Sequence, residues 1–125
     1  MDEIALIGPA NGYSKVASVP AGGRLVWTSG QVPVAADGSV PQGWEEQSRL
    51  VFQNLTEALA AGGARWRDVF KLTLYVVDTG HLPVVRAVRD EFVDTERPPT
   101  SSLVQVAGLF RPDVLLEVEA VASVS

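Results

Sequence analysis

The sequence contains no cysteine and a single histidine, His81, among its 125 residues. Without cysteine the chain cannot form a disulfide, use a thiolate nucleophile or bind a metal through sulfur. Any imidazole-based metal site or Ser-His-Asp triad would depend on His81 alone. Because His81 follows Thr79-Gly80 at an expected helix start, we interpret it as a capping or surface residue. The lack of cysteine also suits the cytoplasm, where we expect the protein to reside.

Positive charge is also scarce, since 10 Lys and Arg residues stand against 15 Asp and Glu residues, for a net charge of -5. The basic residues are scattered, whereas nucleic-acid binding normally needs a basic face, so we expect no nucleic-acid partner. No apolar run approaches the roughly 20 residues of a membrane-spanning helix. The acidic start Met1-Asp2-Glu3 lacks the basic residues of a signal peptide, so we expect no membrane association.

The remaining composition, 46% hydrophobic and 20% charged, is typical of one packed domain, which we place at residues 1–125. Hydrophobic periodicity predicts six strands, at 3–7, 13–19, 24–29, 69–77, 101–107 and 114–124, and two helices, at 43–61 and 82–93. The turn Ala21-Gly22-Gly23 predicts a hairpin between the second and third strands. This order indicates an α+β domain of two layers, with both helices on one face of a mixed sheet.

The faces of the two longest strands indicate how the open side of the sheet is used. In 69–77 the alternation places four apolar residues on one face: Phe70, Leu72, Leu74 and Val76. In 114–124 it places Glu117 and Glu119 opposite another apolar set: Val114, Leu116, Val118 and Ala120. The face that the helices leave open also carries Tyr75 and either Val26 or Trp27, and it is too apolar to stay in water. We therefore expect oligomerisation through that face.

The segment Thr28-Ser29-Gly30-Gln31-Val32-Pro33 places a small polar group of residues at the end of an apolar strand. Gly30 lets a ligand or another backbone approach closely, while Ser29 and Gln31 supply a hydroxyl and an amide. Two interpretations remain open at this point. The segment is either a polar site at the end of a sheet or an ordinary strand end that enters a proline-terminated loop.

Landmarks over nearly the whole chain resemble the Rid family, also called YjgF or L-PSP. They are Gly12-Tyr13-Ser14, Ser29-Gly30-Gln31-Val32-Pro33, Glu46-Gln47, Asn54-Leu55, Asp68-Val69-Phe70-Lys71-Leu72-Thr73, Val77-Asp78, Pro99 and Leu116-Glu117-Val118-Glu119-Ala120. The resemblance implies a chorismate-mutase-like α+β fold, with a six-stranded mixed sheet and two helices on one face. It also implies a homotrimer with clefts between subunits. In active members these clefts hydrolyse imines and enamines to 2-keto acids and ammonia, without a metal or organic cofactor.

The resemblance places the family's deaminase site on this sequence residue by residue. It assigns catalytic roles to Tyr13 and to Glu117, which would hold or activate water, and substrate contacts to Ser29 and Gly30. In the alternative interpretation Glu117 makes a hydrogen bond within a subunit interface and Tyr13 is structural. For Glu119 we favour the structural interpretation.

Two further positions depart from the family pattern. The family's carboxylate-binding arginine falls on Ser101, and a small cysteine two residues later falls on Leu103. A guanidinium grips a carboxylate through two parallel charged hydrogen bonds, whereas serine offers one neutral hydroxyl. Losing such a contact costs about 1.5–3 kcal/mol, or roughly ten- to a hundred-fold in binding or rate. We therefore expect simple imino acids to be poor substrates unless another cation replaces the arginine.

Three arginines could supply that cation: Arg86, Arg97 and Arg111. Arg86 is the strongest of them because it occupies a helix position to which the family usually gives a neutral asparagine. In the alternative interpretation Arg86 and Arg89 are solvated charges on a helix face.

Two functions from different classes remain open on the sequence. The first is hydrolysis of a C=N bond, or of a related small metabolite other than a simple amino-acid imine. The second is a trimeric protein that binds a small metabolite, or regulates a partner, without turnover. A third activity, ribonuclease, is disfavoured by the acidic charge and by the single histidine.

Overall fold

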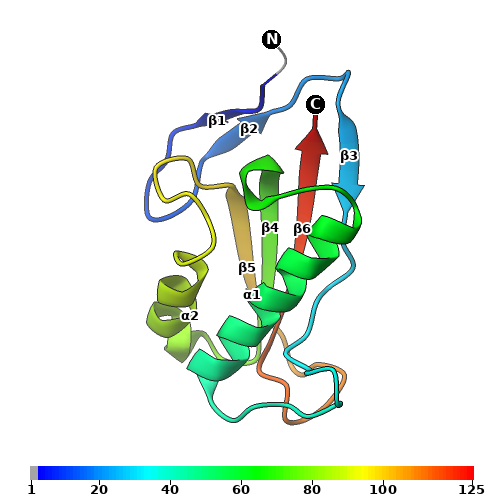
Figure 1. Ribbon diagram of the computed structural model, residues 1–125. Coiled ribbons are helices and arrows are strands. Elements are labelled where there is room, and N and C mark those ends of the chain that lie inside the picture. Colours follow the sequence, from blue (N-terminus) through cyan, green and yellow to red (C-terminus); the bar gives the residue numbers. More distant parts are fainter. Residues whose placement is uncertain (1–2) are drawn as a thin grey trace.

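The computed structural model describes residues 3–125 and contains six strands and two α-helices (Figure 1). The strands are β1 (Ala5–Ile7), β2 (Val16–Ser18), β3 (Arg24–Trp27), β4 (Val69–Val76), β5 (Thr100–Gln105) and β6 (Leu116–Val124). The helices are α1 (Trp44–Ala61) and α2 (Leu82–Arg89), with short 3-10 turns at Trp66–Asp68 and Thr79–His81. Met1 and Asp2, at the start of the predicted domain, lie outside the described residues.

The six strands form a four-stranded sheet in the order β3-β6-β4-β5 and a two-stranded ribbon of β1 and β2. β4 and β5 are parallel, while the other pairs are antiparallel. The predicted hairpin between the second and third strands is wrong, because β2 pairs with β1 and β3 pairs with β6. The ribbon reaches the larger sheet through a parallel bridge between Ser14 and Thr100 at the start of β5.

Both helices lie on the same side of the four-stranded sheet (Figure 1). Helix α1 follows the prediction closely, with Glu45 and Glu46 in its first turn, where they complement the positive end of the helix dipole. Its buried stripe packs on the sheet and consists of Val51, Phe52, Leu55 and Leu59. The sheet contributes alternate residues to the same core, including Leu72, Leu74, Val76, Leu116, Val118 and Ala120.

Helix α2 ends four residues earlier than predicted, at Arg89 rather than at Val93. After Arg89 the backbone tightens, because the amides of Glu91 and Phe92 donate to carbonyls only three residues back. The tightened turn brings Phe92 against Phe52 of α1, with ring centroids 5.5 Å apart. Packing against α1 therefore sets the end of this helix, although the apolar periodicity continues.

A shift of register at the start of β4 changes which residue enters the core. Between Val69 and Lys71 the pairing with β6 slips, so Val69 is buried while Phe70 is only half-buried. The prediction that Phe70 shares one face with Leu72, Leu74 and Val76 is therefore wrong, and Val69 takes its place on that face. Such a bulge inserts one residue into the strand and reverses the side-chain alternation beyond it.

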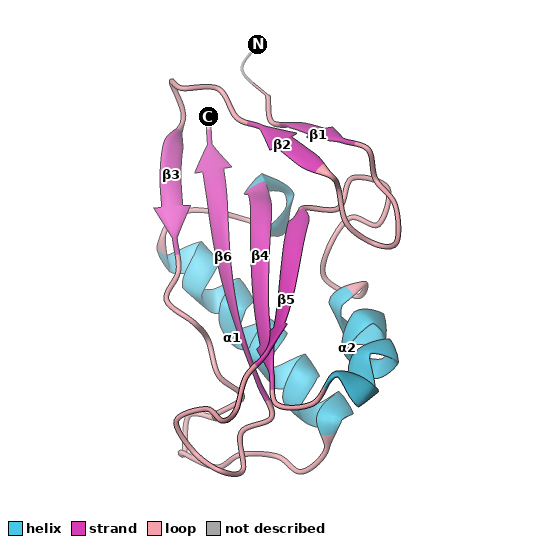
Figure 2. Ribbon diagram, turned by 180° about the vertical axis from the view of Figure 1, so that it is seen from behind, coloured by secondary structure: helices cyan, strands magenta, loops and turns pink. Residues whose placement is uncertain are grey.

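The opposite face of the four-stranded sheet has no helix over it (Figure 2). Pairing places Leu25, Trp27, Tyr75 and Val104 on this open face, and Trp27 is 68% exposed. Val26 instead enters the core, which settles the alternative between Val26 and Trp27. None of the helices in residues 3–125 has the length and apolar character required to cross a bilayer.

Candidate functional site

Ser29 and Gly30 form a bulge at the end of β3. The Thr28 amide donates to the Ala120 carbonyl at 3.0 Å, and the Gln31 amide donates to the Val118 carbonyl at 2.8 Å. Two residues on this segment therefore lie opposite one residue of β6. Bulges of this kind re-aim side chains and are common beside active sites. The structure thus places the polar residues Ser29 and Gly30 at a bulge where β3 ends.

Glu117 of β6 lies directly against Gly30. A Cβ atom at Gly30 would come within 2.7 Å of the Glu117 carboxyl carbon, so a larger residue there would push this carboxylate aside. Glu119, the next carboxylate on the same face, acts on the Tyr75 hydroxyl. Desolvation raises the pKa of Tyr75, and the charge and hydrogen bond of Glu119 and the charge of Glu117 raise it further. Glu119 thus has a structural partner, whereas Glu117 faces the glycine of the bulge.

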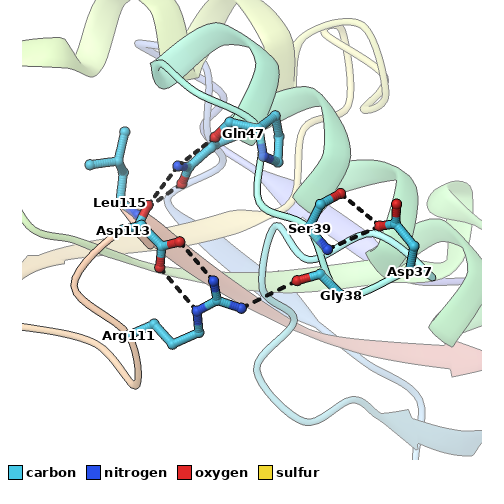
Figure 3. Close-up of polar contacts among 8 residues, drawn as sticks. Asp37, Gly38, Ser39, Gln47, Arg111, Asp113 and Leu115 are labelled. Atoms are coloured by element: carbon cyan, nitrogen blue, oxygen red, sulfur yellow. Dashed lines mark hydrogen bonds and ion pairs between the residues drawn. The ribbon is translucent and has the colours of Figure 1, made fainter.

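Helix α1 holds the loop that follows the bulge. Asn54 donates from Nδ2 to the carbonyls of Val32 at 2.9 Å and Val34 at 3.1 Å. Gln47 is buried and donates from Nε2 to the carbonyls of Pro41 and Asp113, while its Oε1 accepts from the Leu115 amide (Figure 3). These contacts give structural roles to Gln47 and Asn54, one residue from each of the landmarks Glu46-Gln47 and Asn54-Leu55. They fix the loop that follows the bulge and the segment that precedes β6.

A second group of site residues begins with Tyr13 in the N-terminal arm. The next residue, Ser14, is buried, and its hydroxyl donates to the Pro98 carbonyl at 2.6 Å while its amide donates to Pro99. This anchor places Tyr13 beside the start of β5. Gly12 has a φ of 84°, and a Cβ there would come within 3.1 Å of the Arg89 guanidinium carbon. The motif Gly12-Tyr13-Ser14 therefore wraps the arm over α2.

A cavity of about 200 Å³ lies between this arm, α2 and β5. It is lined by Asn11, Tyr13, Leu74, Val85, Arg86, Arg89, Ser101 and Leu103. Four of the predicted site residues therefore meet here, namely Tyr13, Arg86, Ser101 and Leu103. Because the pairing of β5 with β4 sets Ser101 beside Leu72 and Leu103 beside Leu74, both residues face the helix side of the sheet.

The sheet separates this cavity from the other predicted site residues. Glu117 pairs with Tyr75 on the open face, and Gly30 contacts it there, whereas Ser101 and Leu103 lie on the helix side. Within one chain, Ser101 and Glu117 do not line a common pocket. The predicted residues thus fall into two groups, which we call the bulge group (Ser29, Gly30, Glu117) and the cavity group (Tyr13, Arg86, Ser101, Leu103).

Of the arginines considered as replacements, only Arg86 lines the cavity. Arg111 pairs with Asp113 at 2.8 Å and donates to the Gly38 carbonyl, as Figure 3 shows. Arg97 donates to the Ile4 carbonyl at 2.9 Å and lines a different cavity near the chain ends. Both guanidiniums therefore have structural partners away from Ser101.

Arg89 is a cavity residue that sequence reasoning assigned to a solvated helix face. Its side chain is 8% exposed and pairs with Asp90 at 2.9 Å. The solvated interpretation is therefore wrong for Arg89, while Arg86 is exposed. The helix periodicity could have predicted the burial of Arg89, because Arg89 follows the buried residues Val85 and Val88 at helical spacing.

His81 lies at the start of α2, as predicted, but its side chain makes no capping hydrogen bond. Its ring instead stacks on Trp44 at the start of α1, with centroids 4.7 Å apart. Within residues 3–125, no three histidine, aspartate or glutamate side chains gather as a metal site would require.

Comparison with known proteins identifies the family. The family model described as Endoribonuclease L-PSP matches residues 3–124. The chain belongs to the Rid family, as its landmarks predicted. It is 37% identical to TdcF from Escherichia coli over 103 residues, which cover 80% of this chain and 79% of TdcF. It is 34% identical to the 2-iminobutanoate/2-iminopropanoate deaminase of the same organism over 103 residues, with 80% of each chain covered.

Solved structures of Rid proteins share the fold. The crystal structure of E. coli TdcF with bound serine superposes with a TM-score of 0.75 and covers 86% of this chain and 85% of TdcF. The Rid protein YyfB from Yersinia pestis is 28% identical, with a TM-score of 0.81 over 97% of this chain and 98% of YyfB. The predicted α+β fold of the Rid family is thereby confirmed.

Proposed function

We propose that this Rid protein hydrolyses the C=N bond of a small imine or enamine in clefts between the subunits of a homotrimer. The observation that carries the proposal is the placement of the Glu117 carboxylate against Gly30, at a bulge that also presents Ser29. A carboxylate beside a polar turn can orient water toward an electrophilic carbon. The kinship with an imine deaminase, at 34% identity, supports this reaction type.

The proposed reaction consumes one water and releases ammonia. Glu117 orients the water, whose oxygen adds to the imine carbon while the C=N electron pair moves to nitrogen, which takes up a proton. The resulting carbinolamine transfers its hydroxyl proton to nitrogen, the C–N bond breaks and a carbonyl forms. Ser29 and the Gly30 amide support the charge that develops, because Gly30 lies against the carboxylate and Ser29 is its neighbour in the bulge.

An intersubunit cleft belongs to the proposal because the two groups of site residues lie on opposite faces of one sheet. A second subunit on the open face would bring its cavity group to the bulge group of the first. Trp27, Leu25 and Val104 on the open face are 68%, 54% and 44% exposed, which favours burial between subunits. Tyr13 would then shape the cleft from the neighbouring subunit.

The substrate we propose differs from a simple amino-acid imine. Ser101 supplies no charge where the family resemblance implies an arginine, and Leu103 adds an apolar side chain to a cavity of only about 200 Å³. The alternative function, binding of a small metabolite without turnover, is favoured by the same two residues, since they reduce both the charge and the space available.

Hydrolysis of freshly generated imines tests the proposal directly. We expect wild-type protein to release ammonia from at least one member of a panel that varies in size and charge. Glu117→Gln should lose at least about 100-fold in kcat, the lower range for a positioned acid–base group. The matched control is Glu119→Gln, which should lose less than about tenfold. Equal losses would contradict the role of Glu117, and ligand binding without ammonia release would favour the alternative.

A further inference from the structure

We propose that Arg86 is the substrate anchor of this protein, and that it selects an imine or enamine whose carboxylate lies at the mouth of the cavity. This inference rests on the proposed function, because it names the substrate class of the same site. Arg86 and Ser101 line one cavity but come from different elements, α2 and β5. The positive charge in this cavity therefore belongs to a side chain of α2 and not to a side chain of β5.

The charge balance of the cavity supports an anionic ligand. Its lining contains two arginines, Arg86 and Arg89, and no aspartate or glutamate. The Arg89 charge is already balanced, because Nη2 pairs with Asp90 at 2.9 Å and Nε donates to the same carboxylate at 3.0 Å. Among the interactions of the described residues, Arg86 has no ion pair with a carboxylate. The cavity thus has one positive charge to offer a ligand.

Burial separates the roles of the two arginines. Arg89 is almost fully buried, and the arm at Gly12 lies against the Arg89 guanidinium. Packing therefore sets the position of the Arg89 side chain. Arg86 is exposed at the edge of the same cavity, where a planar guanidinium can grip a carboxylate with two hydrogen bonds. Arg89 acts as a positioning residue for the arm, while Arg86 faces the ligand.

The position of Arg86 also determines which carboxylate it can reach. Ser101 is half-buried within the cavity, whereas Arg86 is exposed. A carboxylate held by Arg86 lies farther out than one held at position 101. We therefore expect the preferred substrate to carry its carboxylate some carbons away from the C=N bond, with the intervening chain against Leu103. An α-imino acid, whose carboxylate adjoins the C=N bond, fits this arrangement less well.

The test compares three freshly generated imines: that of a 4-oxo acid, that of the matching 4-oxo amide, and 2-iminopropanoate. For wild-type protein we expect kcat/KM on the 4-oxo acid imine to exceed that on the amide imine by about ten- to a hundred-fold. Arg86→Gln should bring this ratio close to one, mainly through KM. Arg67→Gln, which removes an exposed cation outside the cavity, should leave the ratio unchanged.

A rescue variant and a binding measurement complete the test. Arg86→Gln combined with Ser101→Arg moves the cation to the strand, so we expect 2-iminopropanoate to become the preferred carboxylate substrate. Calorimetric titration with the 4-oxo acid and its amide measures the anchor without catalysis. Hydrolysis with no dependence of the ratio on Arg86 would overturn the anchor and leave the proposed function standing. Arg86-dependent binding of the acid without hydrolysis would support the anchor and overturn the hydrolase.

Discussion

Gly30 and Glu117 are in such close contact that a methyl group on the glycine would overlap the carboxylate. Gly30 follows the end of β3 and Glu117 lies in β6, and they meet because Ser29 and Gly30 bulge out opposite a single residue of β6. The glycine is therefore required by space and not by backbone conformation, since its φ lies outside the left-handed region. This contact connects the most conspicuous sequence motif to the proposed catalytic carboxylate.

Gly30→Ala should impair catalysis more than folding. The added methyl group must push the Glu117 carboxylate aside, and a shift of about 1 Å in a reacting group can cost on the order of 100-fold in rate. The flexible glutamate can move, so we expect little change in the midpoint of urea unfolding.

Ammonia release and urea unfolding measure the two effects. Gly22→Ala is the matched control, because a Cβ there meets no atom within 4 Å. Full activity of Gly30→Ala would show that the position of Glu117 is unimportant.

Gly12→Ala should destabilise the protein by more than its backbone conformation explains. Gly12 and Gly38 both have positive φ, at 84° and 86°, but only Gly12 lies against another residue, Arg89. We expect Gly38→Ala to lower the free energy of unfolding by about 1–2 kcal/mol. Gly12→Ala should cost about 1–3 kcal/mol more, because the Arg89 guanidinium must leave its place beside Asp90. Equal losses in urea unfolding would mean that the arm does not depend on Arg89.

Trp27→Glu should dissociate the proposed trimer. Trp27 is 68% exposed on the open face, and a carboxylate in its place would be costly to bury between subunits. Sedimentation velocity at micromolar concentration should show a trimer for the wild type and a smaller species for the variant. Imine hydrolysis should fall together with the trimer, since each proposed cleft needs two subunits. Ile7→Glu, at an exposed apolar residue of β1, is the control. A monomeric wild type would remove the intersubunit site.

Ionisation of Tyr75 should lower the free energy of unfolding at alkaline pH. Its pKa is raised above 10.0 in the folded protein, first by desolvation and then by Glu119 and Glu117. The folded protein therefore keeps the phenolic proton at pH values where the unfolded chain releases it. The resulting stability is fully present below about pH 10 and is lost as the pH rises through the folded pKa.

Urea unfolding of wild type and Tyr75→Phe, at steps from about pH 9 to about pH 11, measures this effect. The wild type should lose more stability over that range than the variant, which has no phenolic proton at position 75. Parallel losses would show that the Tyr75 proton is not linked to folding. Ultraviolet absorbance of the phenolate provides a second reading of the same titration.

Much of the fold follows from local patterns in the sequence. The 3.6-residue periodicity of 43–61 and the alternation in 114–124 predicted α1 and β6 closely, because each repeat reports directly on one buried face. The family landmarks predicted the fold, and the resemblance named the residues that form the bulge group and the cavity group. The glycines at 12 and 30 were visible as motifs, but the sequence did not show that each lies against a charged side chain.

Tertiary structure alone decided the pairing of strands and the neighbours of each charge. A turn at 21–23 predicted a hairpin, yet β3 pairs with β6, about a hundred residues away in the chain. The burial of Arg89 and the separation of Ser101 from Glu117 by the sheet are likewise set by contacts between distant segments. The sequence by itself determined the order of the helices and strands, most of their buried faces and the family. Only the packed structure decided which side chains meet, because periodicity records the environment of a residue and not the identity of its partners.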